Sequence, residues 1–323
     1  MKSKPTLILP GSFLTNPVIS VILPVYNGDE YLQLSVESVL GQTLENYEFL
    51  IIDDCSSDMS FEYLKNINDP RIRLFRNEKN SGLFFNLNFL IENSQARLIK
   101  LWAQDDIMYP TCLQKFVDFH EKHTNIGFSY CNRDMIDEKG IIRVINKEDN
   151  TPETISTELH SKIAYYTGSI AGNIANVCIN KDALKKVGLF NENMKISGDF
   201  DMWVRLAEFY KTGFLKEKLI KLRDHEKQLS RKEEYYINHV KEDIEVYKNL
   251  DRYASPSVRR EGKKLMIENK LCFYYTLMLK AGLKKNFTVF LQYWVLIGSY
   301  VNIYKLSFYF LKTKILGKKE FKI

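Results

Sequence analysis

The chain has 323 residues, of which 45% are apolar, so it can bury a large core and is not an intrinsically disordered chain. Its length allows one large domain, or one domain with an extension. The formal net charge is +6, but the segment from Leu271 to the end holds nine lysines and one acidic residue, and the rest of the chain sums to −2. This distribution excludes a basic nucleic-acid-binding core.

The five cysteines and the N-terminal residues bear on the compartment. No two cysteines stand at metal-ligand spacing, and an odd number does not make a disulfide framework, so we expect reduced thiols in a cytosolic protein. The apolar run Leu7–Pro10 is too short and too interrupted for a secretion signal. Residues 1–17 are therefore expected to form an arm ahead of the fold.

The first half of the chain alternates strand-like and helix-like segments. Strands are expected at Val18–Pro24, Tyr47–Asp53, Ile72–Phe75, Arg97–Ala103 and Ile126–Cys131. Helices are expected at Asp29–Leu40, Leu83–Asn93 and Pro110–His123. Short apolar runs of this kind are typical of buried parallel strands. Their alternation with helices predicts an α/β fold, in which a mostly parallel, Rossmann-like sheet carries helices on both faces.

This alternation weakens after about residue 132. Residues 132–172 are expected to be a mixture of hairpin and loop, followed by a strand at Asn176–Ile179 and a helix at Gly198–Tyr210. After about Asp224 the pattern changes to long helices rich in Lys and Glu, which we expect at 233–250 and 256–281.

The last segment carries an uncharged run of 19 residues, 286–304, with lysines on both sides. The run is rich in Tyr, Trp and Phe but includes Gln292, Ser299 and Asn302, so it is borderline in length and rather polar for a spanning helix. Aromatic residues flanked by lysines are typical of helices that lie in the interface of an anionic leaflet. An interfacial helix within 286–316, a helix packed on the core and a spanning helix all remain open.

Candidate site residues follow the strands, because ligands of open α/β sheets bind at the carboxyl ends of the strands. After the first strand, Pro24, Tyr26 and Asn27 stand in a tight loop where the Tyr ring can stack on a base, and an ordinary turn is the alternative. After the second strand, Asp53 and Asp54 are costly to bury unless they are hydrogen-bonded or used. Either can accept from a base N–H or a ribose hydroxyl, and a helix N-cap near this loop is the alternative.

Two further groups follow later segments of the sheet. Gly82 permits a close approach of the backbone to a ligand, although a turn explains it equally well. Asp105 and Asp106 follow the fourth strand. Because Mg²⁺ and Mn²⁺ bind one or two carboxylates together with substrate phosphates, this pair fits a metal bound to a diphosphate. The alternative is a helix N-terminus, where Asp is favourable.

The last candidates lie in the second half of the chain. Asp199 opens a helix and can act as a general base on an acceptor hydroxyl if it points into a cleft, with helix capping as the alternative. Arg223 and His225 can contact a pyrophosphate, with a structural role as the alternative for a lone His.

No single one of these motifs is specific, but their order and spacing are. The run SVILPVYNGDEYLQLSVESVLGQTLENYEFLIIDDCSSD is followed in turn by NSGLFFNLN, WAQDDIMYP, SGDFDMWVRL and RDHEKQLS. This series resembles glycosyltransferase family 2 over about residues 18–231. The resemblance implies a GT-A fold, a nucleoside-diphosphate-sugar donor, a divalent metal and inversion at the anomeric carbon. It makes 18–231 the catalytic domain and 232–323 a helical C-terminal region.

The resemblance also assigns roles to the candidate residues. It places Pro24, Tyr26, Asn27, Asp53, Asp54, Gly82 and Asp105 at the nucleotide, Asp106 and His225 at the metal, Arg223 and His225 at the pyrophosphate, and Asp199 as the catalytic base. The chain departs from the family where Ala103 stands in place of an Asp and Gly198 in place of a Glu. It also lacks the Trp that processive synthases carry after a motif like Gln228–Arg231, so a single-sugar, non-processive transfer is expected.

The sequence weighs against other classes of enzyme. It has no G-x-G-x-x-G after the first strand and no P-loop, and His120 and His123 lack a third zinc ligand. A sugar nucleotidyltransferase, or a degenerate relative that binds a nucleotide or a membrane complex without catalysis, are the alternatives. We expect a UDP-sugar donor, Mn²⁺ or Mg²⁺, and a glycan or lipid-linked acceptor in lipopolysaccharide, capsule or other glycan assembly. We also expect a cytoplasmic enzyme that is peripheral on the inner face of the membrane and binds no nucleic acid.

Overall fold

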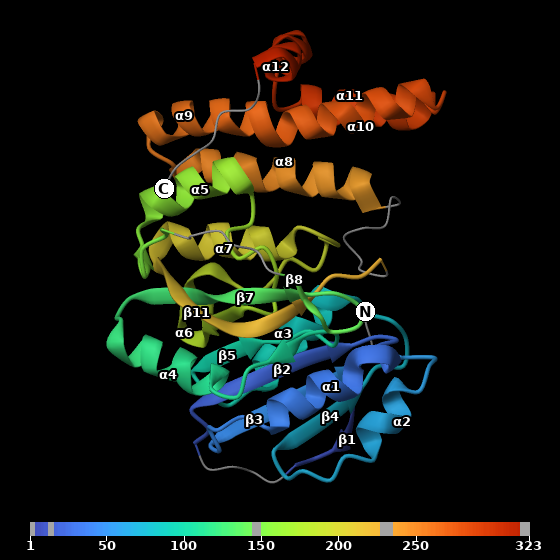
Figure 1. Cartoon of the computed structure of the whole chain (residues 1–323), viewed down its shortest axis with the longest axis vertical. Coiled ribbons are helices and arrows are strands. Elements are labelled where there is room, and N and C mark those ends of the chain that lie inside the picture. The colour runs from blue at the N-terminus through green and yellow to red at the C-terminus, as the bar shows by residue number, and fades with distance from the viewer. Residues whose placement is uncertain (1–3, 12–15, 144–149, 227–234, 317–323) are drawn as a thin grey trace. The chain divides into compact units, whose positions relative to one another are not determined.

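The computed structural model describes residues 4–11, 16–143, 150–226 and 235–316 (Figure 1). The chain forms two compact units, and each is described by itself. Unit 1 comprises Met1–Ile155, Asn173–Lys195 and Phe209–His225, and unit 2 comprises Ser156–Gly172, Ile196–Glu208 and Glu226–Ile323. Unit 2 thus takes two segments from the range 18–231 that the sequence assigned to one domain. Gln228 and Arg231, on which the non-processive expectation rests, lie outside the described residues.

Unit 1 is built on an 11-stranded sheet. Nine strands form its main path in the order β1 (Thr6–Leu9), β4 (Ile72–Arg76), β3 (Tyr47–Asp53), β2 (Ile19–Val25), β5 (Leu98–Leu101), β10 (Val177–Asn180), β7 (Ile126–Ile136), β11 (Lys211–Arg223) and β6 (Ile107–Met108). Two short strands lie off this path, since β8 (Ile142–Arg143) pairs with β7 and β9 (Thr154–Ile155) pairs with β11. Residues of the expected N-terminal arm therefore form an edge strand, because β1 pairs antiparallel with β4.

The strand directions confirm the mostly parallel sheet. β4, β3, β2 and β5 are parallel neighbours. β10 is antiparallel to both β5 and β7, and β7 pairs in parallel with β11. β4, β3, β2, β5, β7 and β11 therefore run in one direction, and their carboxyl ends lie at one edge of the sheet. β6 pairs antiparallel with β11, which brings the residues just before β6 beside the end of β11.

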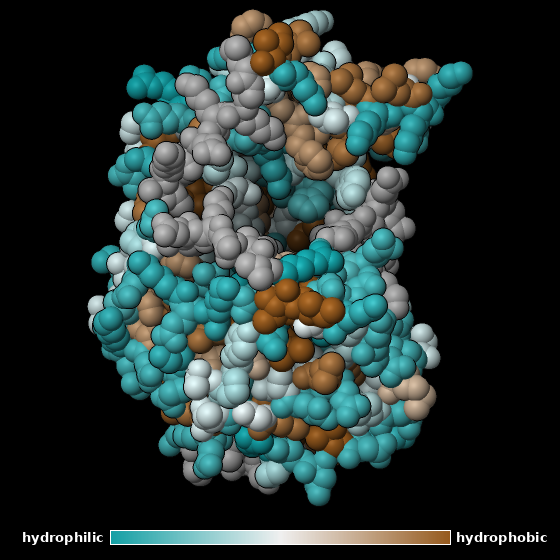
Figure 2. Space-filling view, viewed as in Figure 1, coloured by the Kyte–Doolittle hydropathy of each residue, from teal (hydrophilic) through white to brown (hydrophobic). Residues whose placement is uncertain are grey.

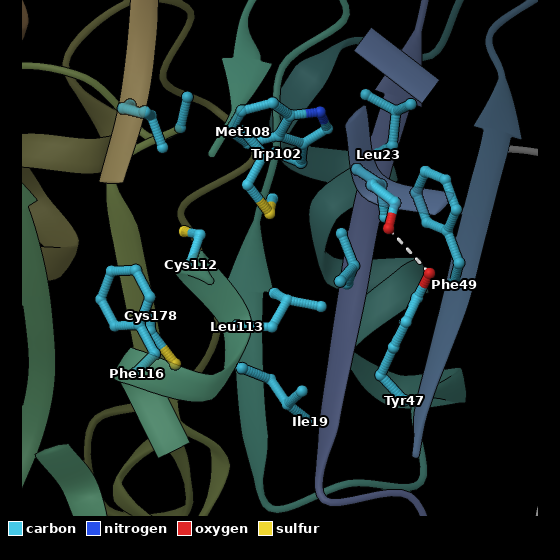
Figure 3. Packing of buried hydrophobic residues seen from close by; sticks show 14 of the residues in the cluster. Ile19, Leu23, Tyr47, Phe49, Trp102, Met108, Cys112, Leu113, Phe116 and Cys178 are labelled. Carbon is cyan, nitrogen blue, oxygen red and sulfur yellow. Dashed lines mark hydrogen bonds between the residues drawn. The ribbon is translucent and has the colours of Figure 1, made fainter. Parts of the chain in front are cut away.

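Helices cover both faces of this sheet, as expected from the sequence. The helices are α1 (Asp29–Leu40), α2 (Ser60–Lys65), α3 (Leu83–Asn93), α4 (Cys112–Lys122) and α6 (Lys181–Val187). Side chains of α1, α2 and α4 join alternate residues of β2 and β3 in one buried cluster, part of which is drawn in Figure 3. There the Tyr47 hydroxyl donates to the Val39 carbonyl at 2.7 Å (Figure 3). α3 packs on the same two strands, but its side chains are not in this cluster, because successive strand residues face opposite sides.

Unit 2 is helical. Its helices are α5 (Thr157–Thr167), α7 (Gly198–Phe209), α8 (Tyr236–Tyr253), α9 (Pro256–Met266), the π-helical turn η3 (Ile267–Leu271), α10 (Cys272–Leu283), α11 (Phe287–Gly298) and α12 (Ile303–Leu316). α9, η3 and α10 follow one another without a break, in agreement with the long helix expected at 256–281. α5 packs on α9, and an added Cβ at Gly262 of α9 would come within 2.2 Å of the Tyr165 ring. The small residue at this position is therefore what permits the close approach of the two helices.

The uncharged run 286–304 is not one helix. It forms α11 and the start of α12, which are separated by a break at residues 299–302. Of α11, only Tyr293 and Ile297 are buried, so it is not the core helix that the sequence left open. Among the described residues, no helix has the length and apolar character needed to cross a bilayer. Figure 2 shows apolar side chains exposed over α11 and α12.

Candidate active site

The loop that follows β2 is held in place by hydrogen bonds with other loops of unit 1. The Gln104 side chain accepts from the Tyr26 backbone N–H at 2.9 Å and donates to the Tyr26 carbonyl at 3.1 Å. The Tyr26 side chain is 48% exposed, so its ring face is available for stacking on a base. Pro24, which precedes it at the end of β2, is partly buried.

Asn27 links this loop to the loop after β3. It adopts a positive φ of 50°, a conformation that Asn tolerates better than most residues. Its side-chain oxygen accepts from the Ser57 N–H at 2.9 Å, and its own N–H donates to the Ser56 hydroxyl at 3.0 Å. The Gly28 N–H donates to the Ser60 hydroxyl at 2.9 Å. Asn27 thus orders two loops at the strand ends, and its contact with a nucleotide stays a prediction.

Asp53 ends β3, Asp54 follows it directly, and both are buried. One oxygen of Asp53 accepts from the Ser56 N–H at 3.2 Å and pairs with the Arg76 guanidinium at 3.2 Å. The other oxygen, Oδ1, is buried and has no hydrogen-bond partner among the described residues. An orphan acceptor of this kind is costly unless a ligand donates to it.

Asp54 has a different environment from its neighbour. Its carboxylate accepts from the Ser81 N–H at 2.7 Å, the Gly82 N–H at 3.0 Å and the Asn77 side-chain amide at 2.7 Å. Gly82 has a φ of 89°, which glycine adopts at little cost, and it immediately precedes α3. The structure therefore brings Asp54 and Gly82 together, and Asp54 organises the turn that begins α3.

The Asp105–Asp106 pair lies beside the end of β11. The Asp106 carboxylate accepts from the Arg223 backbone N–H at 2.8 Å, and Asp105 lies 2.9 Å from Nε2 of His225. The His225 ring also packs against Tyr31 of α1 with ring centroids 5.3 Å apart. Asp105 and Asp106 of one motif and His225 of another, distant in the sequence, are thus neighbours at the carboxyl edge of the sheet.

The Asp106 carboxyl is the most strongly perturbed group of this edge. Burial, with the Asp105 charge beside it, raises the pKa of Asp106 well above its usual range. Its Oδ2 is buried and has no partner among the described residues. No group of three or more His, Cys, Asp or Glu residues in the described part of the chain is gathered as a metal site. A hard cation that takes one or two carboxylates and substrate phosphates needs no such group, so these residues fit one.

Arg223 is buried, and its guanidinium is already engaged. It donates to the backbone carbonyl of Asp105 at 3.0 Å and to those of Asp137 and Glu138 at 2.9 and 3.0 Å. Its charged carbon lies 4.3 Å from the centre of the Tyr31 ring. In this conformation Arg223 braces the Asp105–Asp106 loop, and its contact with a pyrophosphate stays a prediction.

Asp199 belongs to unit 2, at the first turn of α7. Its carboxylate accepts from the Ser169 hydroxyl at 3.3 Å. Burial raises the pKa of Asp199 to about 6, with a further contribution from the charge of Asp243. A carboxylate with such a pKa is suited to take a proton at neutral pH.

The structure adds site-edge residues that sequence reasoning did not single out. They are Asn77, which holds Asp54; Gln104, which holds Tyr26; and Tyr31, which stacks on both Arg223 and His225. Gln104 was visible within the quoted motif WAQDDIMYP, but its partner lies 78 positions away in the sequence. No local signal indicates such a contact.

Comparison with known proteins bears on the identity of this site. The model for "Glycosyl transferase family 2" matches residues 20–178. An uncharacterised glycosyltransferase of Rickettsia typhi is 30% identical over 232 residues, which cover 68% of this chain and 70% of that protein. The chain belongs to glycosyltransferase family 2. An uncharacterised glycosyltransferase of Haemophilus influenzae is 26% identical to this family 2 enzyme and extends the likeness to 77% of this chain and 83% of its own.

Solved structures resemble the glycosyltransferase in fold. The S. aureus protein TarS in complex with UDP-GlcNAc matches with a TM-score of 0.57 at 15% identity, over 77% of this chain and 70% of that one. The mannosyltransferase PcManGT of Pyrobaculum calidifontis, in complex with GDP-Man and Mn²⁺, matches with a TM-score of 0.55 at 11% identity, over 96% and 90% of the two chains. The expected GT-A fold is confirmed by these likenesses.

Proposed function

We propose that this glycosyltransferase moves a single sugar from a nucleoside-diphosphate sugar, with UDP-sugars favoured, to an acceptor hydroxyl with inversion. The observation that carries the proposal is the pairing of carboxylates at one edge of the sheet. Asp53 and Asp54 lie at the carboxyl end of β3, and Asp105 and Asp106 follow β5, with β2 between these two strands. Two buried oxygens there, one on Asp53 and one on Asp106, lack partners among the described residues.

The nucleotide is proposed to bind across the ends of β2 and β3. Tyr26 supplies a ring face and Pro24 an apolar wall for the base, and Asp53 supplies a free acceptor for a base N–H or a ribose hydroxyl. Asp54 supports the binding loop through Gly82. TarS has been solved in complex with UDP and with UDP-GlcNAc, and PcManGT in complex with GDP-Man, which supports a nucleotide donor here and leaves the base to experiment.

A divalent cation, Mn²⁺ or Mg²⁺, is proposed at Asp106, with Asp105 and His225 beside it. Bound there, the cation would supply positive charge to the departing diphosphate. Arg223 fixes the loop through its contacts with backbone carbonyls, and Oδ2 of Asp106, which has no partner among the described residues, is available to a cation. The Mn²⁺ bound to PcManGT is consistent with this proposal.

Asp199 is proposed as the general base that removes the acceptor proton. The acceptor oxygen then attacks the anomeric carbon on the face opposite to the leaving diphosphate, so the configuration inverts. The raised pKa of Asp199, about 6, is the property that this role needs near neutral pH. The acceptor is proposed to be a glycan or lipid-linked glycan in lipopolysaccharide, capsule or other glycan assembly.

Calorimetric titration of UDP, GDP, dTDP and CMP, each with and without Mn²⁺, tests the donor proposal. We expect one nucleotide to bind in a metal-dependent manner, and Asp106→Asn to weaken that binding by about tenfold or more, since the substitution removes the charge that faces the cation. The matched control is Asp118→Asn, which removes an exposed carboxylate of α4 that accepts from the Gln114 side chain. Absence of binding for all four nucleotides would contradict the proposal and favour a degenerate relative.

We propose further that the exposed faces of α11 and α12 contact an anionic membrane surface on the cytoplasmic side. Phe287, Leu291 and Val295 recur at intervals of four on α11 and are 58–66% exposed. α12 exposes four more large apolar side chains, those of Tyr304, Phe308, Leu311 and Ile315. The lysines that follow Leu271 complement the charge of an anionic leaflet. Apolar side chains flanked by lysines are what an interfacial helix requires.

Sedimentation with vesicles of phosphatidylcholine and phosphatidylglycerol tests this contact. We expect the triple variant Phe287→Gln, Leu291→Gln, Val295→Gln to reduce the bound fraction by about tenfold, because three side chains no longer enter the interface. The control pair Leu34→Gln and Met59→Gln changes exposed apolar residues of α1 and of the loop before α2 instead. Equal sedimentation of the triple variant and the control would contradict the membrane proposal.

A further inference from the structure

Two neighbouring carboxylates of α8 are buried against the segment that begins α7. The Glu242 side chain accepts from the backbone N–H groups of Ile196 at 2.9 Å and Ser197 at 2.8 Å. The Asp243 side chain accepts from the Ser197 hydroxyl at 2.6 Å. Glu242 is 7% and Asp243 is 2% exposed. Burying two carboxylates costs free energy unless each is well hydrogen-bonded, as both are here. The pair is therefore part of the packed interior of unit 2 and not a chance arrangement at its surface.

Three further side chains contact the Asp243 carboxylate. Lys270 of η3 lies 3.1 Å from one carboxylate oxygen, His239 lies 3.6 Å from the other, and the Tyr274 hydroxyl donates to the former. Burial alone would raise the pKa of Asp243, but Lys270, His239 and the Ser197 hydroxyl together hold it well below its usual range. Asp243 is therefore ionised at the near-neutral pH at which Asp199 is proposed to act.

Asp199 lies two residues after Ser197, within reach of this charge. The groups that face Asp199 are the Ser169 hydroxyl at 3.3 Å, its neighbour Phe200 through the backbone N–H, the negative Asp243 and the imidazole of His239. Lys270 stands behind Asp243 and neutralises part of its field. Asp243 favours the protonated form of Asp199, whereas Ser169 and a protonated His239 favour the ionised form.

We propose that Glu242 and Asp243 are positioning residues for Asp199, which fix the start of α7 through their hydrogen bonds with Ile196 and Ser197 and hold a negative charge near the proposed base. This inference rests on the proposed role of Asp199 as the base. A base with raised proton affinity transfers the acceptor proton more effectively near neutral pH, provided that it is still mainly ionised there. The two carboxylates of α8 would thus adjust the proton affinity of Asp199 to the pH at which the enzyme works, and they would hold the backbone at the start of α7 in place.

The pH dependence of kcat, measured for the full chain with its nucleotide sugar, tests the proposal through changes of opposite sign. Asp243→Asn is expected to move the acidic limb of the profile to lower pH by about half a unit or more, because a nearby negative charge is removed. Ser169→Ala and His239→Gln are expected to move it to higher pH, because each removes a group that favours ionised Asp199. Glu242→Gln is expected to lower kcat with no displacement of the limb.

The inference is overturned if the acidic limb of the kcat profile lies at the same pH in the wild type and in the variants Asp243→Asn, Ser169→Ala and His239→Gln. If Asp243→Asn does not fold, because Lys270 is left without its carboxylate partner, the Glu242→Gln variant decides: a kcat equal to that of the wild type overturns the inference. The proposed function fails separately, namely if Asp199→Asn retains transfer. A variant Asp199→Asn without transfer, together with unmoved limbs in the others, would leave Asp199 as the base and remove the role of α8.

Discussion

Asp199→Asn is expected to lower the rate of sugar transfer by about 10²–10⁴-fold, the usual contribution of a positioned general base, while nucleotide binding is retained. The amide keeps the size and the hydrogen bond from Ser169 but does not accept a proton from the acceptor hydroxyl. Transfer is measured as release of the nucleoside diphosphate in the presence of acceptor, and binding is measured by calorimetry on the same preparation.

The pH profile of the wild type supplies a second check on Asp199. The base must be ionised to act, and burial raises its pKa to about 6. The rate is therefore expected to be level above that pH and to fall about tenfold for each unit below it. A matched control is Asp201→Asn, which changes a buried carboxylate of the same helix that pairs with Arg205 at 2.8 Å. Full activity of Asp199→Asn, or loss of activity in Asp201→Asn alone, would contradict the assignment.

Arg223→Met is expected to lower the free energy of unfolding by about 2–4 kcal/mol, because three backbone carbonyls lose the buried charged donor that they share. Those carbonyls belong to Asp105, Asp137 and Glu138, and the stacking of the guanidinium on Tyr31 is lost as well. Urea unfolding followed by circular dichroism measures the effect. Calorimetry with the bound nucleotide then shows how far the Asp105–Asp106 loop depends on the brace.

A surface arginine of the same unit provides the control for Arg223. Arg143 is 54% exposed and pairs with Asp224 at 2.8 Å, so Arg143→Met is expected to change the free energy of unfolding by less than about 1 kcal/mol. The two roles considered for Arg223, a structural brace and a contact with the pyrophosphate, predict different results in these measurements. Unchanged unfolding of Arg223→Met, together with weaker binding of the nucleoside diphosphate, would contradict the structural brace and favour direct contact with the pyrophosphate.

The strands and helices of the first half of the chain were predictable because the apolar pattern of each segment matches the way in which that segment is buried. β2 and β3 are buried along almost their whole length, and such strands appear in the sequence as continuous apolar runs bounded by turns. Helix α4 of this half is amphipathic, since it buries Phe116 and Val117 while Lys115 and Glu121 stay outward. Local pattern and tertiary burial agree in these segments.

Several elements escaped prediction, three of them for identifiable reasons. β11 contains four lysines and one arginine in 13 residues, and it is a strand because it pairs along its length with β7 and ends beside β6. α5 lies in the region expected to be hairpin and loop, although Ser156 caps it by accepting from the Leu159 N–H at 3.2 Å. α6 is only seven residues long, and Asn180 caps it. The two caps were visible in the sequence, whereas the partners of β11 were not.

For the active site, the sequence by itself determined which residue types stand at the ends of the strands, and hence the family and its chemistry. Only the tertiary structure decided what each carboxylate does: Asp54 organises the turn at Gly82, Asp53 and Asp106 each keep an unpaired oxygen, and Asp243 faces Asp199. The reason is physical. The sequence specifies the identity of each side chain. The hydrogen-bond partners and the pKa of that side chain depend on groups that folding brings from distant positions, as Arg223 is brought to Asp105 from 118 residues away.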